Sequence, residues 1–237
     1  MPYEVLTDRL DAVKLKSMLF NSYPFIFVYL PIVWLGFFAI SQRTKVGGIF
    51  YLGLASLVFY GYVNPKLVFL LLISICFNYA AALAIIHASR PLGQKLLVVS
   101  ICANLLCLTA FKYLNFFITT ANHFHANWPE LDILLPVGIS FFTFTQIAFL
   151  VDVYRGLAKE TRFMHYLLFV TWFPHLIAGP VLHHSQMMPQ FKAATTYRPN
   201  IEPITGGITF FTIGLFKKVV LADGRNCSFT NGAVFFK

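Results

Sequence analysis

Charged residues are scarce in this sequence. They make up 11% of its 237 residues, whereas hydrophobic residues make up 58% and aromatic residues 17%. A soluble domain has roughly 25% charged and about 45–50% apolar residues. Together with a mean hydropathy of +0.70, this composition excludes an ordinary soluble domain and indicates an integral membrane protein.

Acidic residues are the rarer kind of charge, with 9 Asp and Glu against 18 Lys and Arg. In a membrane protein, an excess of basic residues collects in short loops and sets the topology. No basic run alternates with stacking aromatic residues on a soluble face, so we predict no nucleic-acid partner.

The sequence also lacks the cysteine spacings that are typical of disulfide-rich domains and zinc sites. None of the four cysteines forms a C-x-x-C pair, and three of them lie inside apolar runs. In such a run, a thiol usually serves as a small hydrophobic group. The sequence therefore predicts neither a disulfide framework nor a metal site.

The N-terminus lacks the features of a signal peptide. Residues 1–17 (MPYEVLTDRLDAVKLKS) are polar, with no apolar stretch after a short basic start and no A-x-A site. We interpret 1–17 as an N-terminal extension or a misplaced start, and 18–237 as the transmembrane domain.

Long apolar runs dominate the rest of the chain, and their lengths approach the 17–25 residues of a transmembrane helix. The seven runs cover approximately 25–40, 46–63, 67–86, 96–111 (with a possible continuation through KYLNFFITT), 133–151, 166–182 and 204–222. Gly, Pro, Asn and Lys interrupt several runs, and such helices need shielding by neighbours in lipid. We predict an all-α polytopic transmembrane bundle of about seven spans, some short, tilted or re-entrant.

The charges of the loops predict the orientation. Residues 113–133 contain no Lys or Arg, so we expect this loop outside the cell. The loops on the expected cytoplasmic side contain Arg43, Lys45, Arg90, Lys95, Arg155, Lys159 and Arg162.

Polar residues inside spans are candidates for function because they are costly in lipid. Asn78 and Asn104, together with Ser74 and Ser100, are expected to hydrogen-bond between helices, with a substrate contact as the alternative. Gln146 is open to the same two readings, as a link between helices or as a residue that orients a substrate.

Two adjacent lysines, Lys217 and Lys218, follow the apolar run that begins at 204. They are expected either to snorkel at the cytoplasmic boundary of the membrane or to attract an anionic headgroup or cofactor phosphate.

Three histidines lie in the segment FPHLIAGPVLHHSQMMPQF, residues 173–191. His175 follows a proline inside a span. Its imidazole can be a hydrogen-bonded core group or a proton acceptor.

The other two histidines, His183 and His184, come shortly after Gly179 and Pro180. This Gly-Pro pair should stop or bend the helix, which would place both histidines at a helix end near the interface. Adjacent histidines do not have the i, i+4 spacing of helical metal ligands, so we predict no metal here. A general base, a structural role and substrate lining remain the alternatives.

Four segments in order resemble the membrane-bound O-acyltransferases: 18–31 (MLFNSYPFIFVYLP), 135–156 (LPVGISFFTFTQIAFLVDVYRG), 173–191 and 214–223 (GLFKKVVLAD). The likeness is to the bacterial branch that holds the membrane subunit of alginate O-acetylation and the D-alanyl transfer protein of teichoic acids.

The resemblance implies an enzyme of the bacterial inner membrane that needs no bound cofactor. It implies transfer of an acyl group, acetyl in the alginate branch, from a cytoplasmic thioester such as acetyl-CoA to a polysaccharide hydroxyl. Soluble periplasmic acetyltransferase-type partners complete the transfer in that branch.

The resemblance assigns no catalytic residue to this chain. The histidine essential to the family lies in a later tryptophan-histidine segment, and no Trp-His pair occurs here. His184 remains the candidate general base from the residues themselves. The residues expected to line the family's funnel are Gln146, His175, Gly179, Pro180 and His183.

Family members run to roughly twice this length, so we expect an N-terminal portion of the larger bundle that is inactive alone. The alternatives are a non-enzymatic membrane protein, as a transporter or assembly subunit, and a decayed fragment. A transporter would typically show inverted repeats, and we find no such symmetry in the sequence.

Overall fold

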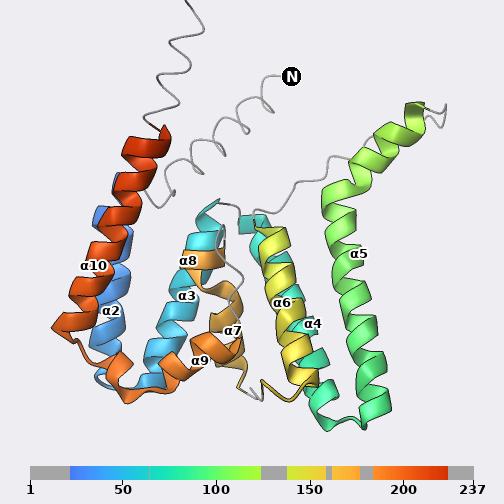
Figure 1. Ribbon diagram of the computed structural model, residues 1–237, viewed down its shortest axis with the longest axis horizontal. Coiled ribbons are helices and arrows are strands. Elements are labelled where there is room, and N and C mark those ends of the chain that lie inside the picture. Colours follow the sequence, from blue (N-terminus) through green and yellow to red (C-terminus); the bar gives the residue numbers. More distant parts are fainter. Residues whose placement is uncertain (1–21, 64, 124–137, 159–161, 177–183, 224–237) are drawn as a thin grey trace, which may run out of the picture.

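The computed structural model describes residues 22–63, 65–123, 138–158, 162–176 and 184–223, and within these ranges all regular structure is helical. The helices are η1 (Phe25–Tyr29, a π-helix), α2 (Leu30–Ser41), α3 (Lys45–Val63), α4 (Pro65–His87), α5 (Arg90–His123), α6 (Ile139–Tyr154), α7 (Phe163–Thr171), α8 (Phe173–Leu176), α9 (His184–Lys192), η2 (Ala194–Tyr197, a 3-10 helix), α10 (Ile201–Phe216) and η3 (Lys217–Asp223, a π-helix). Figure 1 shows the long helices side by side as a bundle.

Membrane-compatible lengths support the predicted helical membrane bundle. Three helical stretches are long and apolar enough to cross a bilayer, namely Leu67–His87, Arg90–His123 and Ile201–Leu221. Shorter apolar helices cover Phe25–Ser41 and Ile139–Tyr154. Six of the seven expected runs therefore correspond largely to a helix or a pair of consecutive helices, counting α3 for the second run.

Most of the described basic residues lie at one end of the bundle; Lys66, Lys112, Lys217 and Lys218 do not. The connections α2–α3, α4–α5, α6–α7 and α9–α10 all lie at the lower end in Figure 1, which we name the basic end. The described cations in or beside these connections are Arg43, Lys45, Arg90, Lys95, Arg155, Arg162, Lys192 and Arg198. The grouping expected from the loop charges is confirmed, and its cytoplasmic location stays a prediction.

Helix α5 is longer than the run 96–111 that marked it. It continues through KYLNFFITT to His123, for a total of 34 residues. At 1.5 Å per residue this is about 51 Å, well beyond the ~30 Å hydrocarbon core. The continuation has no Gly or Pro to end the helix, so the helix extends past the apolar stretch that hydropathy detects.

The apolar run 166–182 is not one continuous helix, because α7 ends at Thr171; residues 177–182 of the run lie outside the described residues. Trp172 leaves the helical conformation with a ψ of 105°, and the short helix α8 begins at Phe173. Pro174 has no N–H to continue the ladder, which favours an interruption at this point. The backbone N–H of Phe173 donates instead to Ser56 Oγ of α3 at 3.3 Å. A break inside the membrane needs such a partner.

Two hydrophobic clusters form the core, and α7 contributes to both. Its residues from His165 to Thr171 are all buried. Phe169 packs in the cluster of α4, α5, α6 and α9, whereas Leu168 packs in the cluster of η1, α2 and α3. The nine-residue α7 therefore joins the two halves of the bundle.

Local signals set the ends of α6 and α10. Gly156 has a φ of 77°, a left-handed conformation that suits glycine and ends α6. After this turn, Leu157 N–H donates to the carbonyl of Asp152 at 2.9 Å. At the start of α10, Asn200 Oδ1 accepts from the N–H of Glu202 at 3.2 Å, which is an N-cap.

Candidate site around the interrupted helix α7–α8

His175 is a predicted site residue whose two ring nitrogens are buried and unpaired among the described residues. It lies on α8 and is only 5% exposed. Leaving a buried polar atom unpaired costs about 1–3 kcal/mol, so a group that is not part of the described chain is the natural partner.

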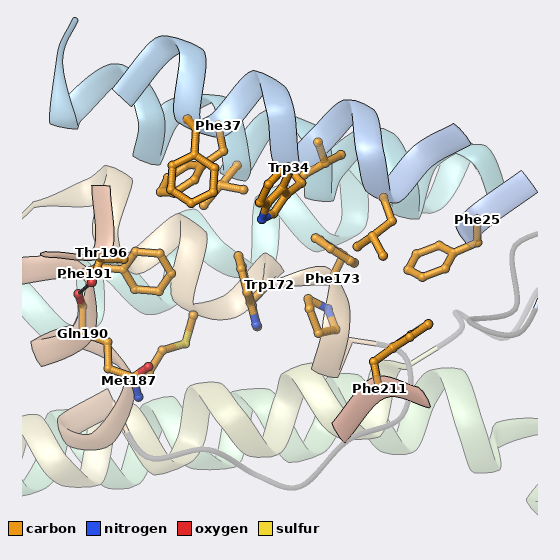
Figure 2. A pocket seen from close by; sticks show the side chains of 15 residues that line it. Phe25, Trp34, Phe37, Trp172, Phe173, Met187, Gln190, Phe191, Thr196 and Phe211 are labelled. Carbon is orange, nitrogen blue, oxygen red and sulfur yellow. Dashed lines mark hydrogen bonds between the residues drawn. The ribbon is translucent and has the colours of Figure 1, made fainter. Parts of the chain in front are cut away.

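A large apolar cavity begins at the neighbouring residue, Pro174. This aromatic cavity has a volume of about 830 Å³ and is walled by η1, α2, α8 and α9, with Phe211 of α10 at one edge. Figure 2 shows Trp172 and Phe173 opposite Trp34 and Phe37 of α2. Its walls offer shape and hydrophobic contact, with few polar groups.

Aromatic packing fixes Phe173 against the N-terminal helices. Its ring centroid is 5.4 Å from that of Tyr29, 5.7 Å from Phe59 and 6.1 Å from Phe25. Two of these contacts are edge-to-face and the one with Phe59 is tilted, and together they stabilise one arrangement of the rings. Tyr29 also donates through Oη to the carbonyl of Ala55 at 3.0 Å. The start of α8, and with it His175, is thereby held in place.

His184, the candidate general base, lies in an aromatic environment. It is the first residue of α9 and is 5% exposed. Its ring centroid is 5.1 Å from that of Phe149 on α6 and 5.2 Å from that of Phe169 on α7. This packing favours a structural role for the ring.

Gln146 belongs to a ladder of buried polar side chains that links α4, α5 and α6. Its Oε1 accepts from Ser74 Oγ at 2.8 Å and also from Asn78 Nδ2. Asn78 in turn bonds with Asn104, and Asn104 Nδ2 donates to the carbonyl of Ser100. The expected hydrogen bonding between helices is confirmed for the two asparagines, and Gln146 joins them.

One side-chain atom of this ladder, Nε2 of Gln146, has no hydrogen-bond partner among the described residues. Gln146 is fully buried. Gln146 lies one turn before Phe149 on α6, so the ladder and the ring of His184 meet along the same helix. A lining role for Gln146 stays a prediction.

The remaining site predictions fare differently. Gly179, Pro180 and His183 lie outside the described residues. Lys217 and Lys218 begin η3 at the end of α10 that lies away from the basic end (Figure 1). This end is opposite the one predicted to be cytoplasmic, because α10 runs the height of the bundle before it reaches them, and the role of the two lysines stays a prediction.

Known proteins are similar to this chain over most of its length. It is 38% identical to a peptidoglycan O-acetyltransferase of Helicobacter pylori, over 92% of this chain and 47% of that protein. It is 35% identical to the probable alginate O-acetylase AlgI of Pseudomonas aeruginosa, over 87% of this chain and 40% of that protein. The corresponding protein of Azotobacter vinelandii is also 35% identical, over 87% and 42%.

The chain belongs to the membrane-bound O-acyltransferase family. It spans about half the length of the curated relatives it matches, over their N-terminal part. No family model matches the sequence, and no solved structure does.

Sequence reasoning missed two parts of the site. Ser56 supports the break before Phe173, and the only signal for it was a hydroxyl within the apolar run 46–63. The aromatic cavity brings together residues from 25 to 211, a separation that no local pattern can show.

Proposed function

We propose that this protein acts in the transfer of an acetyl group from a cytoplasmic thioester, with acetyl-CoA as the donor, to a hydroxyl of an envelope polysaccharide. The 38% identity to a protein named peptidoglycan O-acetyltransferase carries this proposal. The identity to proteins named alginate O-acetylase supports the same reaction on a second glycan. We further propose an inner-membrane location and periplasmic acetyltransferase-type partners.

The proposed reaction is an acyl transfer from sulfur to oxygen, with no change in oxidation state. The hydroxyl oxygen of the acceptor attacks the thioester carbonyl, a C–O bond forms, and the C–S bond breaks. The hydroxyl proton passes through a base to the leaving thiolate, which is released as the thiol. A dry site in the membrane limits the competing loss of the acyl group to water.

His175 is our proposed lining residue for the path of the acyl group or its acceptor. Its two ring nitrogens are buried without partners in the described chain, and it follows a residue that lines the aromatic cavity. A hydroxyl or carbonyl that passes this point would satisfy one nitrogen. Gln146 Nε2 offers a second unpaired donor of the same kind.

Disruption of the gene tests the reaction. Ester-linked acetate is released from the envelope glycans by mild alkali and measured in the parent, the disrupted strain and a complemented strain. We expect a loss of acetate from one glycan on disruption and its return on complementation. Unchanged acetate in every glycan fraction would support a transporter or assembly subunit instead and would overturn the proposal.

The role of His175 is tested separately in the complemented strain. We expect His175→Ala to lower the acetate content by about tenfold or more, because a misplaced reactant loses that much rate. His87→Ala is the matched control, since His87 is exposed at the end of α4 and bonds only to its own helix, at Leu83. Immunoblots of membranes confirm equal amounts of both variants. Equal acetate with both would leave the reaction standing and remove His175 from it.

We also propose that these 237 residues do not transfer acetyl groups by themselves. The sequence has no Trp-His pair, the segment to which the family resemblance ties catalysis. Purified in detergent and supplied with acetyl-CoA and a glycan acceptor, the chain should release thiol only at the background rate. Acetyl transfer above that of heat-inactivated protein would contradict this.

A further inference from the structure

A groove runs between α2 and α10 on the outside of the bundle. It does not include His175 or Gln146, but it adjoins the aromatic cavity and shares five lining residues with it: Leu30, Trp34, Phe38, Thr196 and Phe211. We name it the α2–α10 groove; its volume is about 820 Å³. Its lining residues on α10 are Ile204, Gly207, Ile208 and Phe211, with Pro203 at the start, and those on α2 are Leu30, Pro31, Trp34 and Phe38. Their spacing by three and four residues puts each set on one helix face.

Helices α2 and α10 do not pack tightly against each other along the groove. The apolar 18-residue window of α10 has no residue buried inside the described structure. A Cβ added at Gly207 would meet no atom within 4 Å, although Gly207 lines the groove. Figure 1 shows α10 alongside α2 at the edge of the bundle. The open space between them is lined mostly by apolar residues.

The groove has one polar end. Thr195, Thr196, Arg198 and Asn200 line it there, beside the basic end of the bundle. Within the described part of the chain, no ion pair neutralises Arg198. Lys45 Nζ lies 5.9 Å from the ring centroid of Tyr197, the residue before Arg198, although Lys45 itself does not line the groove. Arg198 is the charged side chain among the lining residues, and the exposed Glu202, which does not line the groove, lies two residues after Asn200.

The length of the groove fits one leaflet. From Asn200 to Phe211 the chain advances 11 helical steps, or roughly 17 Å at 1.5 Å per residue. Half of a ~30 Å hydrocarbon core is about 15 Å. A chain that starts at the polar end would thus reach Phe211 near the middle of the bilayer.

We propose that the α2–α10 groove binds one anionic glycerophospholipid, with its phosphate at Arg198 and an acyl chain along α10 as far as Phe211. Three observations converge on this occupant: a cation at one end, an apolar stripe on both walls and a length of one leaflet. Anionic lipids are drawn to basic residues at the cytoplasmic surface, which is where loop charges predict the basic end.

Photolabelling of the purified protein in lipid nanodiscs tests the proposal. The probe is phosphatidylglycerol with a photoactivatable group on one acyl chain, compared with phosphatidylcholine that carries the same group. We expect phosphatidylglycerol to label peptides that contain 30–38 and 204–211. Arg198→Gln should lower this labelling about fivefold, the effect of one cation near an anionic surface. Lys192→Gln, which removes an exposed charge that does not line the groove, should leave it unchanged.

Substitutions at two adjacent glycines test whether the lipid occupies the groove itself. Gly207→Leu fills the space and should reduce labelling to background. Gly206→Leu also meets no atom within 4 Å, but Gly206 does not line the groove, so its labelling should equal that of the parent. Both variants keep the same helix and the same added side chain, and circular dichroism confirms that each is folded.

Each other outcome overturns the proposal in a recognisable way. Equal labelling by the two lipids would make the groove a nonspecific part of the lipid boundary. Loss of labelling with inorganic phosphate as competitor would identify a site for free phosphate. A protein–protein adduct from a photoreactive residue placed at Gly207 would identify a polypeptide occupant, such as a second copy of this chain.

Discussion

Asn78 and Asn104 face each other across α4 and α5 and exchange two side-chain hydrogen bonds. Asn78 Nδ2 donates to Asn104 Oδ1 at 3.0 Å, and Asn104 Nδ2 donates to Asn78 Oδ1 at 2.7 Å. Both side chains are buried, with exposures of 0% and 6%. In a bundle that lacks a hydrophobic force between lipid-facing helices, such reciprocal pairs fix which helices meet.

Replacing one member of this pair leaves the other amide without its partner. We expect Asn104→Leu to lower the free energy of unfolding by about 1–2 kcal/mol, measured by titration with a denaturing detergent. The double variant Asn78→Leu, Asn104→Leu should lose less than the sum of the two single losses. The coupling energy should fall between about 0.6 and 1.7 kcal/mol. Strict additivity would show that the pair contributes nothing.

Ser56 supplies the acceptor that the interrupted helix needs. Ser56→Ala leaves the buried N–H of Phe173 unpaired. We expect a loss of about 1–3 kcal/mol in the free energy of unfolding. Thr120→Ala is the control, because the exposed Thr120 hydroxyl bonds only to its own helix, at Phe116. If both variants lose the same small amount, the N–H of Phe173 has another partner.

His184 can be tested as a packing residue rather than a base. The ring lies between Phe149 and Phe169. His184→Phe should therefore keep the free energy of unfolding within about 1.5 kcal/mol of the parent, and His184→Ala should lose about 2–4 kcal/mol. The acetate content of the glycan should survive the phenylalanine. Acetate lost with a stable, folded His184→Phe protein would restore the general-base hypothesis.

Thiol labelling tests the orientation of the bundle. In a background without the native cysteines, Arg43→Cys and Ser89→Cys place a thiol at the basic end, and His123→Cys places one at the far end of α5. We expect a membrane-impermeant reagent to label only His123→Cys in intact spheroplasts, because the basic end is predicted to face the cytoplasm. Permeabilised spheroplasts should show labelling at all three positions. Labelling of Arg43→Cys in the intact cells would invert the orientation.

Hydropathy predicted most of the helices because a helix that spans the hydrocarbon core of the bilayer needs a long run of apolar residues. The run at 67–86 lies almost entirely within α4, Pro65–His87. The polar residues inside those runs were also informative. Asn78 and Asn104 had to find partners in an environment without water, and the hydrogen bonds between α4 and α5 were predictable for that reason.

The interruption at Trp172 was not predictable in the same way. Phe173 and Pro174 fall in the middle of an apolar run, and the Gly-Pro pair further on looked like the stronger break. What makes the earlier break tolerable is Ser56 on another helix. A contact between residues 117 positions apart has no local signature, and the cavity beside it depends on the same long-range packing.

Helix α7 also constrains how the protein enters the membrane. Nine residues rise only about 14 Å, less than half of the ~30 Å hydrocarbon core. Such a segment cannot be inserted alone by a translocon that selects for long apolar stretches. Because α7 is buried between two clusters, α3, α4 and α6 must already be in the bilayer to receive it. Insertion therefore has an order, in which α7 and the following α8 with His175 join the bundle after α3, α4 and α6.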